Sequence, residues 1–218
     1  VVAVYAGPEK ILVRTRSGSG LWGREAIIDD DVPPNLSGPQ TVTGADDHVH
    51  LAYTGTNGTA WYRQILPDGS LTPRIQIASD LGTSEADSGS ILPLVLLPET
   101  GTVVVIYRSR AGEIRERRIR GHEALTEPVR VTERRVIQNA VDSDQTGADA
   151  IGDGSAVHVL FIEEGSGSIF HTRSDADGIW SPATLEVDGI RGQWIRGAPV
   201  TLGDGVRRYG YVYDAGSD

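Results

Sequence analysis

Val103-Val104-Val105-Ile106-Tyr107 is a short apolar run that ends in an aromatic residue, and it decides the fold because similar runs return along the chain. The other runs are Val1 to Tyr5, Val49 to Tyr53, Val157 to Phe161 and Tyr209 to Tyr213. Short β-branched runs between turn signals predict buried strands. The closing aromatics lie between 48 and 54 residues apart, which indicates an architecture built from repeats of about 50 residues.

Each repeat is predicted to contain four short strands. In the second copy they are expected at Gly38 to Thr43, Val49 to Thr54, Ala60 to Ile65 and Ile75 to Ala78. No helical period is sustained for more than about two turns, so the chain is predicted to be all-β. Four strands per unit are typical of a β-propeller blade, whereas a β-sandwich would not repeat one turn at one offset.

The copies predict a single β-propeller domain over residues 1–218. Its blades are expected at about 1–31, 38–79, 91–133 and 147–188, with a partial blade at 197–218. The first copy begins, and the last copy stops, at the second strand of a blade, so a closed four-bladed ring would hold one redundant strand. We therefore expect an incomplete part of a six- or seven-bladed ring, with the remainder of the same propeller as a partner.

Composition excludes several classes of partner. The formal net charge is -10, and such a surface repels a phosphate backbone, so no nucleic acid is expected. No stretch approaches the ~20 apolar residues of a membrane helix, so no membrane partner is expected. The chain has no cysteine, which excludes disulfides.

Two hairpins resemble a known repeat. Thr15 to Trp22 and Thr172 to Trp180 are similar to degenerate forms of the Asp-box of the bacterial neuraminidase repeat, S-x-D-x-G-x-x-W, and the second hairpin is one residue short of it. The segments Asp47 to Leu51 and Ser155 to Val159 are also similar to sialidase-like propellers. The resemblance implies a propeller with a leaning towards glycans, and the Asp-box itself implies a folding element. We expect a secreted protein of polysaccharide degradation, extracellular or periplasmic.

A weaker resemblance connects the chain to polysaccharide lyases of the ulvan-lyase type. Those enzymes use a histidine or tyrosine to take and return protons beside a uronic acid, and an arginine to neutralise its carboxylate. Their pattern expects histidines near Leu36 and Thr56, and neither position has one here.

Positions that recur in every copy are interpreted as structural. The recurrent aromatics are expected to pack between neighbouring sheets. A recurrent arginine in the third strand is expected to bond a turn or a carboxylate, and its copies are taken to be Arg16, Arg63, Arg173 and either Arg117 or Arg118. His50 and His158 occupy equivalent strand positions, which predicts burial between blades and not a metal site.

Positions where the copies differ are better site candidates, because a single site on a pseudo-symmetric ring must break the symmetry. An enzyme directed at a uronate needs a proton-handling group and a cation for the carboxylate. The predicted catalytic residues are His171, Tyr62 and Arg108, and the predicted ligand-binding residues are Trp194, Arg196 and Arg110. An indole that stacks on a sugar beside an arginine is a common saccharide contact. Surface hydrogen bonding and packing under a loop are the alternatives for these residues.

The acidic loops offer a second kind of site. Asp29-Asp30-Asp31 and Asp142-Ser143-Asp144 could bind Ca²⁺ or supply an acid and a base, and solvated loop charge is the alternative. No cofactor is required by the sequence. The prediction is a glycan-recognising propeller with a saccharide or polysaccharide ligand, part of a carbohydrate-active enzyme, either a polysaccharide lyase or a glycoside hydrolase. The alternative is a non-catalytic lectin or protein-binding scaffold.

Overall fold

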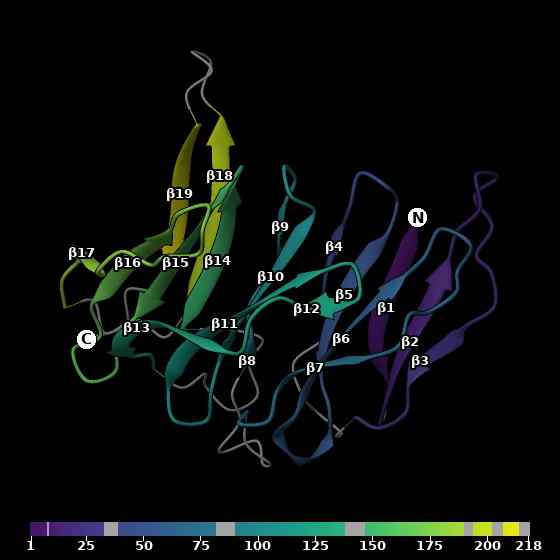
Figure 1. The fold of residues 1–218 in the computed structure, drawn as a ribbon, viewed down its shortest axis with the longest axis horizontal. Helices are drawn as coiled ribbons and strands as arrows, with labels where there is room; N and C mark the ends of the chain where they lie inside the picture. The colour runs from purple at the N-terminus through teal and green to yellow at the C-terminus, as the bar shows by residue number, and fades with distance from the viewer. Residues whose placement is uncertain are drawn as a thin grey trace.

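The structure, a computed structural model, describes residues 1–7, 9–32, 39–81, 90–137, 147–189, 194–201 and 207–213. The strands in these ranges form five antiparallel sheets (Figure 1). The first holds β1 (Val2–Gly7), β2 (Lys10–Thr15) and β3 (Ala26–Asp29). The second holds β4 (Gln40–Thr43), β5 (Val49–Thr54), β6 (Ala60–Ile65) and β7 (Ile75–Ala78), with a short 3₁₀ turn, η1 (Thr56–Gly58), between β5 and β6.

The remaining sheets continue the same up-and-down order. The third holds β8 (Ser90–Ile91), β9 (Val95–Leu97), β10 (Thr102–Arg108), β11 (Glu113–Arg120), β12 (Glu123–Ala124) and β13 (Val129–Arg135). The fourth holds β14 (Ala148–Asp153), β15 (Ala156–Ile162), β16 (Ile169–Ser174) and β17 (Thr184–Val187), and the fifth holds β18 (Ile195–Thr201) and β19 (Arg207–Tyr213). Across these ranges, no helix has the length and apolar character needed to cross a membrane.

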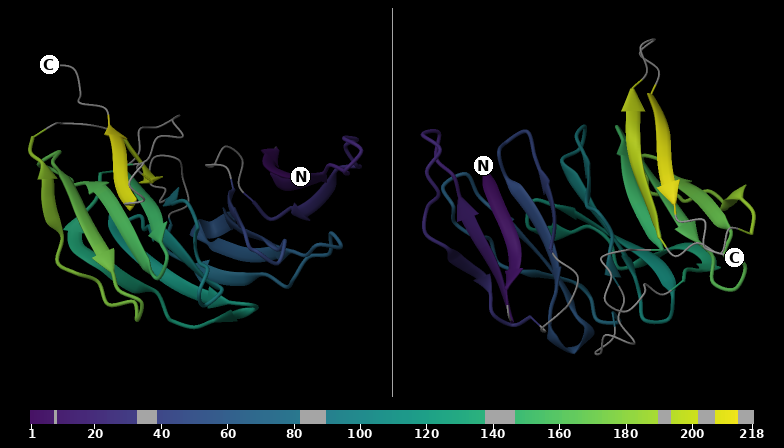
Figure 2. Two further views of the ribbon diagram at one scale, coloured as in Figure 1. Left: turned by 90° about the horizontal axis from the view of Figure 1, so that it is seen from above. Right: turned by 180° about the vertical axis from the view of Figure 1, so that it is seen from behind.

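Successive sheets pack face to face around an arc. The inner strand of one sheet contacts the inner strand of the next, since β9 contacts β4 and β14, and β14 contacts β18. Seen from above, the sheets fan out along this arc (Figure 2). Repeated four-stranded antiparallel sheets in this arrangement confirm the predicted all-β propeller architecture. One predicted strand is divided: Pro93 separates β8 from β9, because proline cannot donate to the ladder.

Four of the five recurrent aromatics pack between sheets, as predicted, whereas Tyr5 is half-buried and bonds the Glu25 carboxylate. Tyr53, Tyr107 and Phe161 are at most 1% exposed. Tyr53 packs with Val13 of the first sheet, and Phe161 packs with Val104 of the third. The side chains of Tyr53 and Phe161 therefore pack against the sheet that precedes their own.

A side-chain hydrogen bond recurs with constant spacing in the first four sheets, from the strand that follows the aromatic one, which is β2, β6, β11 or β16. Each donor reaches a backbone carbonyl nine residues further along the chain, in the bonds Arg14 Nε to Gly23 O (3.2 Å), Arg63 Nε to Thr72 O (2.8 Å), Arg117 Nε to Thr126 O (3.0 Å) and Thr172 Oγ1 to Ser181 O (2.7 Å). The recurrent arginine is therefore Arg14, Arg63 and Arg117, and Thr172 takes its place in the fourth sheet.

The predicted alignment of Arg16 and Arg173 with Arg63 is wrong. Arg173 pairs with His158 across the sheet, and the equivalent partner of His50 is Gln64. Hydrogen-bonded register sets equivalence between strands, and a one-residue offset sends a side chain to the opposite face.

Two of these arginines also join neighbouring sheets. Arg63 donates from Nη1 to Ile28 O of β3 at 2.6 Å, and Arg117 donates from Nη1 to Gln76 O of β7 at 2.5 Å. Each guanidinium therefore ties a hairpin of its own sheet to the outer strand of the preceding sheet.

Replacing Arg63 by alanine is expected to lower the free energy of unfolding by about 1.5–3 kcal/mol, because charge-assisted bonds to two carbonyls are lost. Urea unfolding of the two proteins measures this difference. Arg24→Ala is the matched control, because Arg24 is exposed, and we expect a change within about 0.5 kcal/mol. Equal losses for both variants would contradict a joining role for Arg63.

Candidate functional site

A β-bulge recurs in the outer strand of three sheets, and one copy is chemically different. The register shifts at this bulge, so that no residue of the neighbouring strand pairs with Ile28 in β3, Ile77 in β7 or Glu186 in β17. Ile28 and Ile77 are buried, as a residue facing the next blade should be. Glu186 puts a carboxylate in the same place, and its side chain is 36% exposed.

His171 breaks the symmetry on the same face. The strand pairing makes His171 equivalent to Val13 of β2, Tyr62 of β6 and Glu116 of β11. Each of these residues pairs with the residue that precedes the recurrent aromatic of its sheet. The side chain of His171 is 27% exposed, whereas Val13, Tyr62 and Glu116 are buried, so the exposure of His171 sets it apart from its equivalents.

The fifth sheet faces this region with tyrosines. Tyr209 and Tyr211 of β19 occupy the positions that Val103 and Val105 hold in β10. Both tyrosines pack against the apolar cluster between the fourth and fifth sheets, which includes Leu160 and Ile169, and they add ionisable groups at its edge. We call this group the histidine face and define it as His158, His171, Glu186, Tyr209 and Tyr211.

Direct contacts join the members of the histidine face. His158 Nδ1 and His171 Nε2 lie 2.9 Å apart in a hydrogen bond. His171 Nδ1 lies 3.7 Å from Glu186 Oε1, and the ring of His158 packs on Tyr209 with centroids 4.2 Å apart. Asp153 Oδ2 lies 4.0 Å from His158 Nε2 at the inner end of this row.

Burial keeps both histidines neutral near pH 7. It lowers the pKa of His158 to about 4, and the neighbouring His171 and Arg173 act in the same direction. Burial also lowers the pKa of His171, although the Glu186 carboxylate opposes the change. Because Nε2 of His171 is held by His158, Nδ1 is the ring atom placed to exchange a proton with a ligand.

Tyr62 and Arg108 lie away from the histidine face, in the second and third sheets. Tyr62 is buried, bonds His50 Nδ1 at 2.6 Å and Gln64 Nε2 at 3.0 Å, and has its pKa raised to about 12 by burial. Arg108 is also buried and donates to Val136 O at 3.0 Å, and burial lowers its pKa. The predicted catalytic residues are therefore not brought together, and the contacts of Tyr62 and Arg108 are structural.

The predicted ligand-binding residues lie at two places. Arg110 is exposed in the turn after β10, and its backbone N–H bonds Asp80 O at 2.8 Å. Trp194 is half-buried directly before β18, and Arg196 is half-buried within that strand. A ligand role for these three residues stays a prediction.

The first acidic loop is engaged in protein contacts. Asp29 accepts hydrogen bonds from Tyr53 Oη at 2.5 Å and from the Asp31 N–H at 3.0 Å, and it pairs with Arg74 at 3.2 Å. The segment 142–144 lies outside the described residues. Among the residues that are described, no group of three acidic, histidine or cysteine side chains could hold a metal ion.

His50 and His158 are buried between sheets, as predicted.

Comparisons with known proteins support the fold. No protein-family model and no curated protein matches the sequence. A solved structure described as "NanB plus Optactamide" is similar over 94% of this chain and 32% of its own length, with 14% identity and a TM-score of 0.55. The chain therefore spans about a third of that protein.

Two further structures are similar at lower scores. A putative exo-beta-1,3-galactanase from Bifidobacterium bifidum S17 shares 12% identity over 89% of this chain and 72% of its own, with a TM-score of 0.45. The catalytic domain of a GH62 alpha-L-arabinofuranosidase from Coprinopsis cinerea shares 10% identity over 82% of this chain and 64% of its own, with a TM-score of 0.44. The NanB structure is the one of these three whose similarity exceeds 0.5, and at this identity it shows a common fold.

Proposed function

We propose that the chain is the glycan-recognising part of a carbohydrate-active enzyme and that the histidine face carries its proton transfer. The observation that supports the proposal is the grouping of His171, Glu186 and Tyr211, none of them fully buried, in one place between the fourth and fifth sheets. Tyr62 and Glu116 occupy the position of His171 in the second and third sheets and are buried, whereas His171 and Glu186 are 27% and 36% exposed. Ionisable groups with shifted pKa values that a ligand can reach point to a function.

The chemistry fits removal of a proton beside a uronate carboxylate. His171 is neutral and half-buried, so its Nδ1 can accept the proton at C5 of a uronic acid. Arg173 is exposed and lies two residues further along β16, on the same side as His171, where it can neutralise the uronate carboxylate. Glu186 then stabilises the imidazolium that forms.

The leaving group completes the step. As the C5–H electron pair forms the C4=C5 double bond, the C4–O bond breaks and the leaving oxygen takes up a proton. Tyr211 is the candidate donor, because burial and Glu186 raise its pKa and keep the phenol protonated. The proposed activity is thus a β-elimination in a uronate-containing polysaccharide, a lyase reaction.

A polysaccharide panel tests this function. The full natural polypeptide is incubated with uronate-containing and neutral polysaccharides, and the ultraviolet absorbance of an unsaturated uronate and the release of reducing ends are followed. Both signals on a uronate polysaccharide support the lyase, and reducing ends without the absorbance indicate a hydrolase. Saturable glycan binding without turnover would identify a lectin. The absence of both binding and turnover would contradict a glycan function.

A further inference from the structure

The hydrogen bond between His158 and His171 can hold its proton in two ways. Both rings are neutral near pH 7, so each ring carries one N–H. In the first arrangement, Nε2–H of His171 donates to Nδ1 of His158, and Nδ1 of His171 is a bare acceptor. In the second arrangement, His158 is the donor and Nδ1 of His171 carries a proton. Only the first arrangement gives His171 a base that a ligand can use.

The inner end of the pair favours the first arrangement. Nε2 of His158 is buried, has no hydrogen-bond partner among the described residues, and lies 4.0 Å from Asp153 Oδ2. A proton on this nitrogen is attracted by the carboxylate. A bare lone pair would instead be buried beside a negative charge, out of reach of solvent, which is costly for a polar atom.

The outer end favours the second arrangement, but less strongly. Oε1 of Glu186 lies 3.7 Å from Nδ1 of His171 and attracts a proton on that atom. The side chains of His171 and Glu186 are 27% and 36% exposed, whereas that of His158 is 7% exposed. Water screens the outer contact and can donate to a bare Nδ1, so the contact at the buried nitrogen decides the tautomer.

The second sheet contains the same pair with a donor of defined direction. His50 and Tyr62 occupy the places of His158 and His171, and Tyr62 Oη lies 2.6 Å from His50 Nδ1. The Tyr62 oxygen accepts a bond from Gln64 Nε2 at 3.0 Å, so its own hydrogen is donated to His50 Nδ1. A histidine at this place therefore uses Nδ1 as its acceptor, as in the first arrangement.

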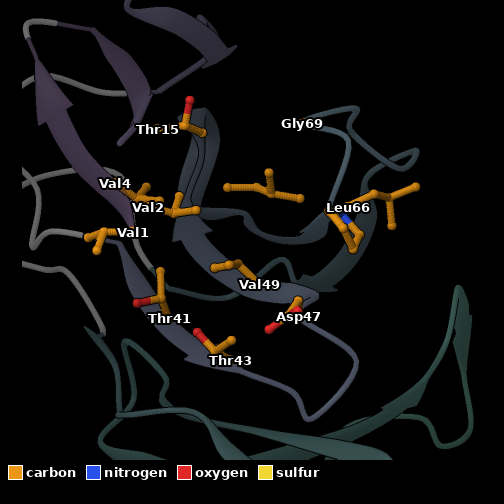
Figure 3. A pocket seen from close by; sticks show the side chains of 12 residues that line it. Val1, Val2, Val4, Thr15, Thr41, Thr43, Asp47, Val49, Leu66 and Gly69 are labelled. Atoms are coloured by element: carbon orange, nitrogen blue, oxygen red, sulfur yellow. The ribbon is translucent and has the colours of Figure 1, made fainter. Parts of the chain in front are cut away.

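The corresponding place between the first and second sheets is apolar. Val2 and His158 each lie three residues before the recurrent aromatic of their sheet, and Val49 and Tyr209 each lie four residues before theirs. Figure 3 shows Val2 and Val49 among the side chains that line the groove between these two sheets. The packing of one blade on the next therefore does not itself require a histidine at the place of His158.

We propose that Asp153 and His158 are positioning residues that hold His171 as its Nε2–H tautomer, with Nδ1 as the bare base. The use of this base rests on the proposed function, whereas the tautomer is a property of the protein without substrate. When Nδ1 takes up the C5 proton of the uronate, His171 becomes an imidazolium. Its Nε2–H remains bonded to His158, and no proton passes to Asp153.

Nitrogen-15 NMR of labelled histidine rings measures the tautomers above pH 7 in the absence of substrate. We expect a bare Nδ1 and a protonated Nε2 in both His158 and His171. Asp153→Ala should move His171 to the Nδ1–H tautomer, because Glu186 then attracts the proton, and Asp153→Glu should restore the first tautomer. Glu186→Gln is the matched control, since it removes the other flanking carboxylate and should leave the tautomer unchanged.

Turnover of the uronate polysaccharide gives an independent readout. In Asp153→Ala, kcat should fall at least about tenfold and KM should change less than about twofold, because Asp153 acts through His171 and does not contact the substrate. Circular dichroism checks the fold, and the tautomer of the unsubstituted protein decides the inference if the variant unfolds.

The two readouts separate this inference from the proposed function. An Nδ1–H tautomer of His171 in the unsubstituted protein, or a tautomer that does not move in folded Asp153→Ala, would overturn the inference whether or not the protein is a lyase. The expected tautomers in a protein that turns over no polysaccharide would support the positioning by Asp153 and His158 and contradict the proposed lyase reaction.

Discussion

The His171→Ala variant is expected to keep its fold and to lose about 10²–10⁴-fold in turnover of the uronate polysaccharide found in the panel. The loss follows because Nδ1 of His171 lies at the partly exposed end of the histidine pair, with its charged form supported by Glu186 at 3.7 Å. The value of kcat/KM and a circular dichroism spectrum measure activity and fold. His122→Ala is the matched control, because His122 is exposed in the turn after β11.

The pH dependence of the same reaction gives a second readout. A general base works in its neutral form, so activity should fall as the pH drops through the pKa of His171. Since burial lowers that pKa, the acid limb should have its midpoint below 6.5. Glu186→Gln removes the carboxylate that raises the pKa and should move the acid limb further down. Full activity in His171→Ala, or an acid limb unmoved by Glu186→Gln, would place proton transfer elsewhere.

The strands of this propeller could be predicted closely from the sequence. The expected bounds of Val49–Thr54, Ala60–Ile65 and Thr102–Arg108 agree with the structure. Each lies between turn signals and is rich in apolar residues. Val49–Thr54 and Thr102–Arg108 are buried on both faces and Ala60–Ile65 is buried mainly on one, so local pattern and tertiary packing favour the same conformation.

The candidate site could be predicted less well from the sequence, because its composition depends on the strand register and on β-bulges. His171 could be recognised as an outlier, but Glu186 could not be matched to Ile28 and Ile77 until the bulge in each outer strand was known. Aligning arginines by identity displaced Arg173 by one residue, since a repeated residue type does not fix a hydrogen-bonded register. The face that a side chain occupies follows from that register.

A buried ion pair joins the third sheet to the Asp-box-like hairpin of the fourth, and its loss should have the largest effect on stability. Arg118 and Glu116 are 7% and 2% exposed, with Arg118 Nε 3.2 Å from Glu116 Oε1. Arg118 also reaches the hairpin at Ser174 Oγ (3.3 Å) and Ala176 O (3.4 Å). Gly178 permits this approach, because a Cβ there would lie 2.8 Å from Arg118 Cζ.

We expect Arg118→Ala to lower the free energy of unfolding by about 3–5 kcal/mol, because it leaves the Glu116 carboxylate buried without its cation. Urea unfolding at pH 7 measures the loss. Arg120→Ala, at the exposed end of the same strand, is the control and should cost under about 1 kcal/mol.

The pH dependence of this loss identifies its cause. Burial raises the pKa of Glu116 above 4.5 in the folded protein, and Arg118 opposes that rise. Without Arg118, the pKa of Glu116 in the folded protein should rise further above its value in the unfolded chain. The free energy of unfolding is then highest below the unfolded pKa and falls as the pH rises through the folded pKa. The deficit of Arg118→Ala should therefore be largest near neutral pH and shrink on acidification.

Glu116→Gln with Arg118→Met removes both charges and should recover most of the loss, because replacing a whole buried pair is often nearly neutral. A deficit that is independent of pH and remains in the double variant would attribute the loss to the hairpin contacts of Arg118 and not to the uncompensated charge of Glu116.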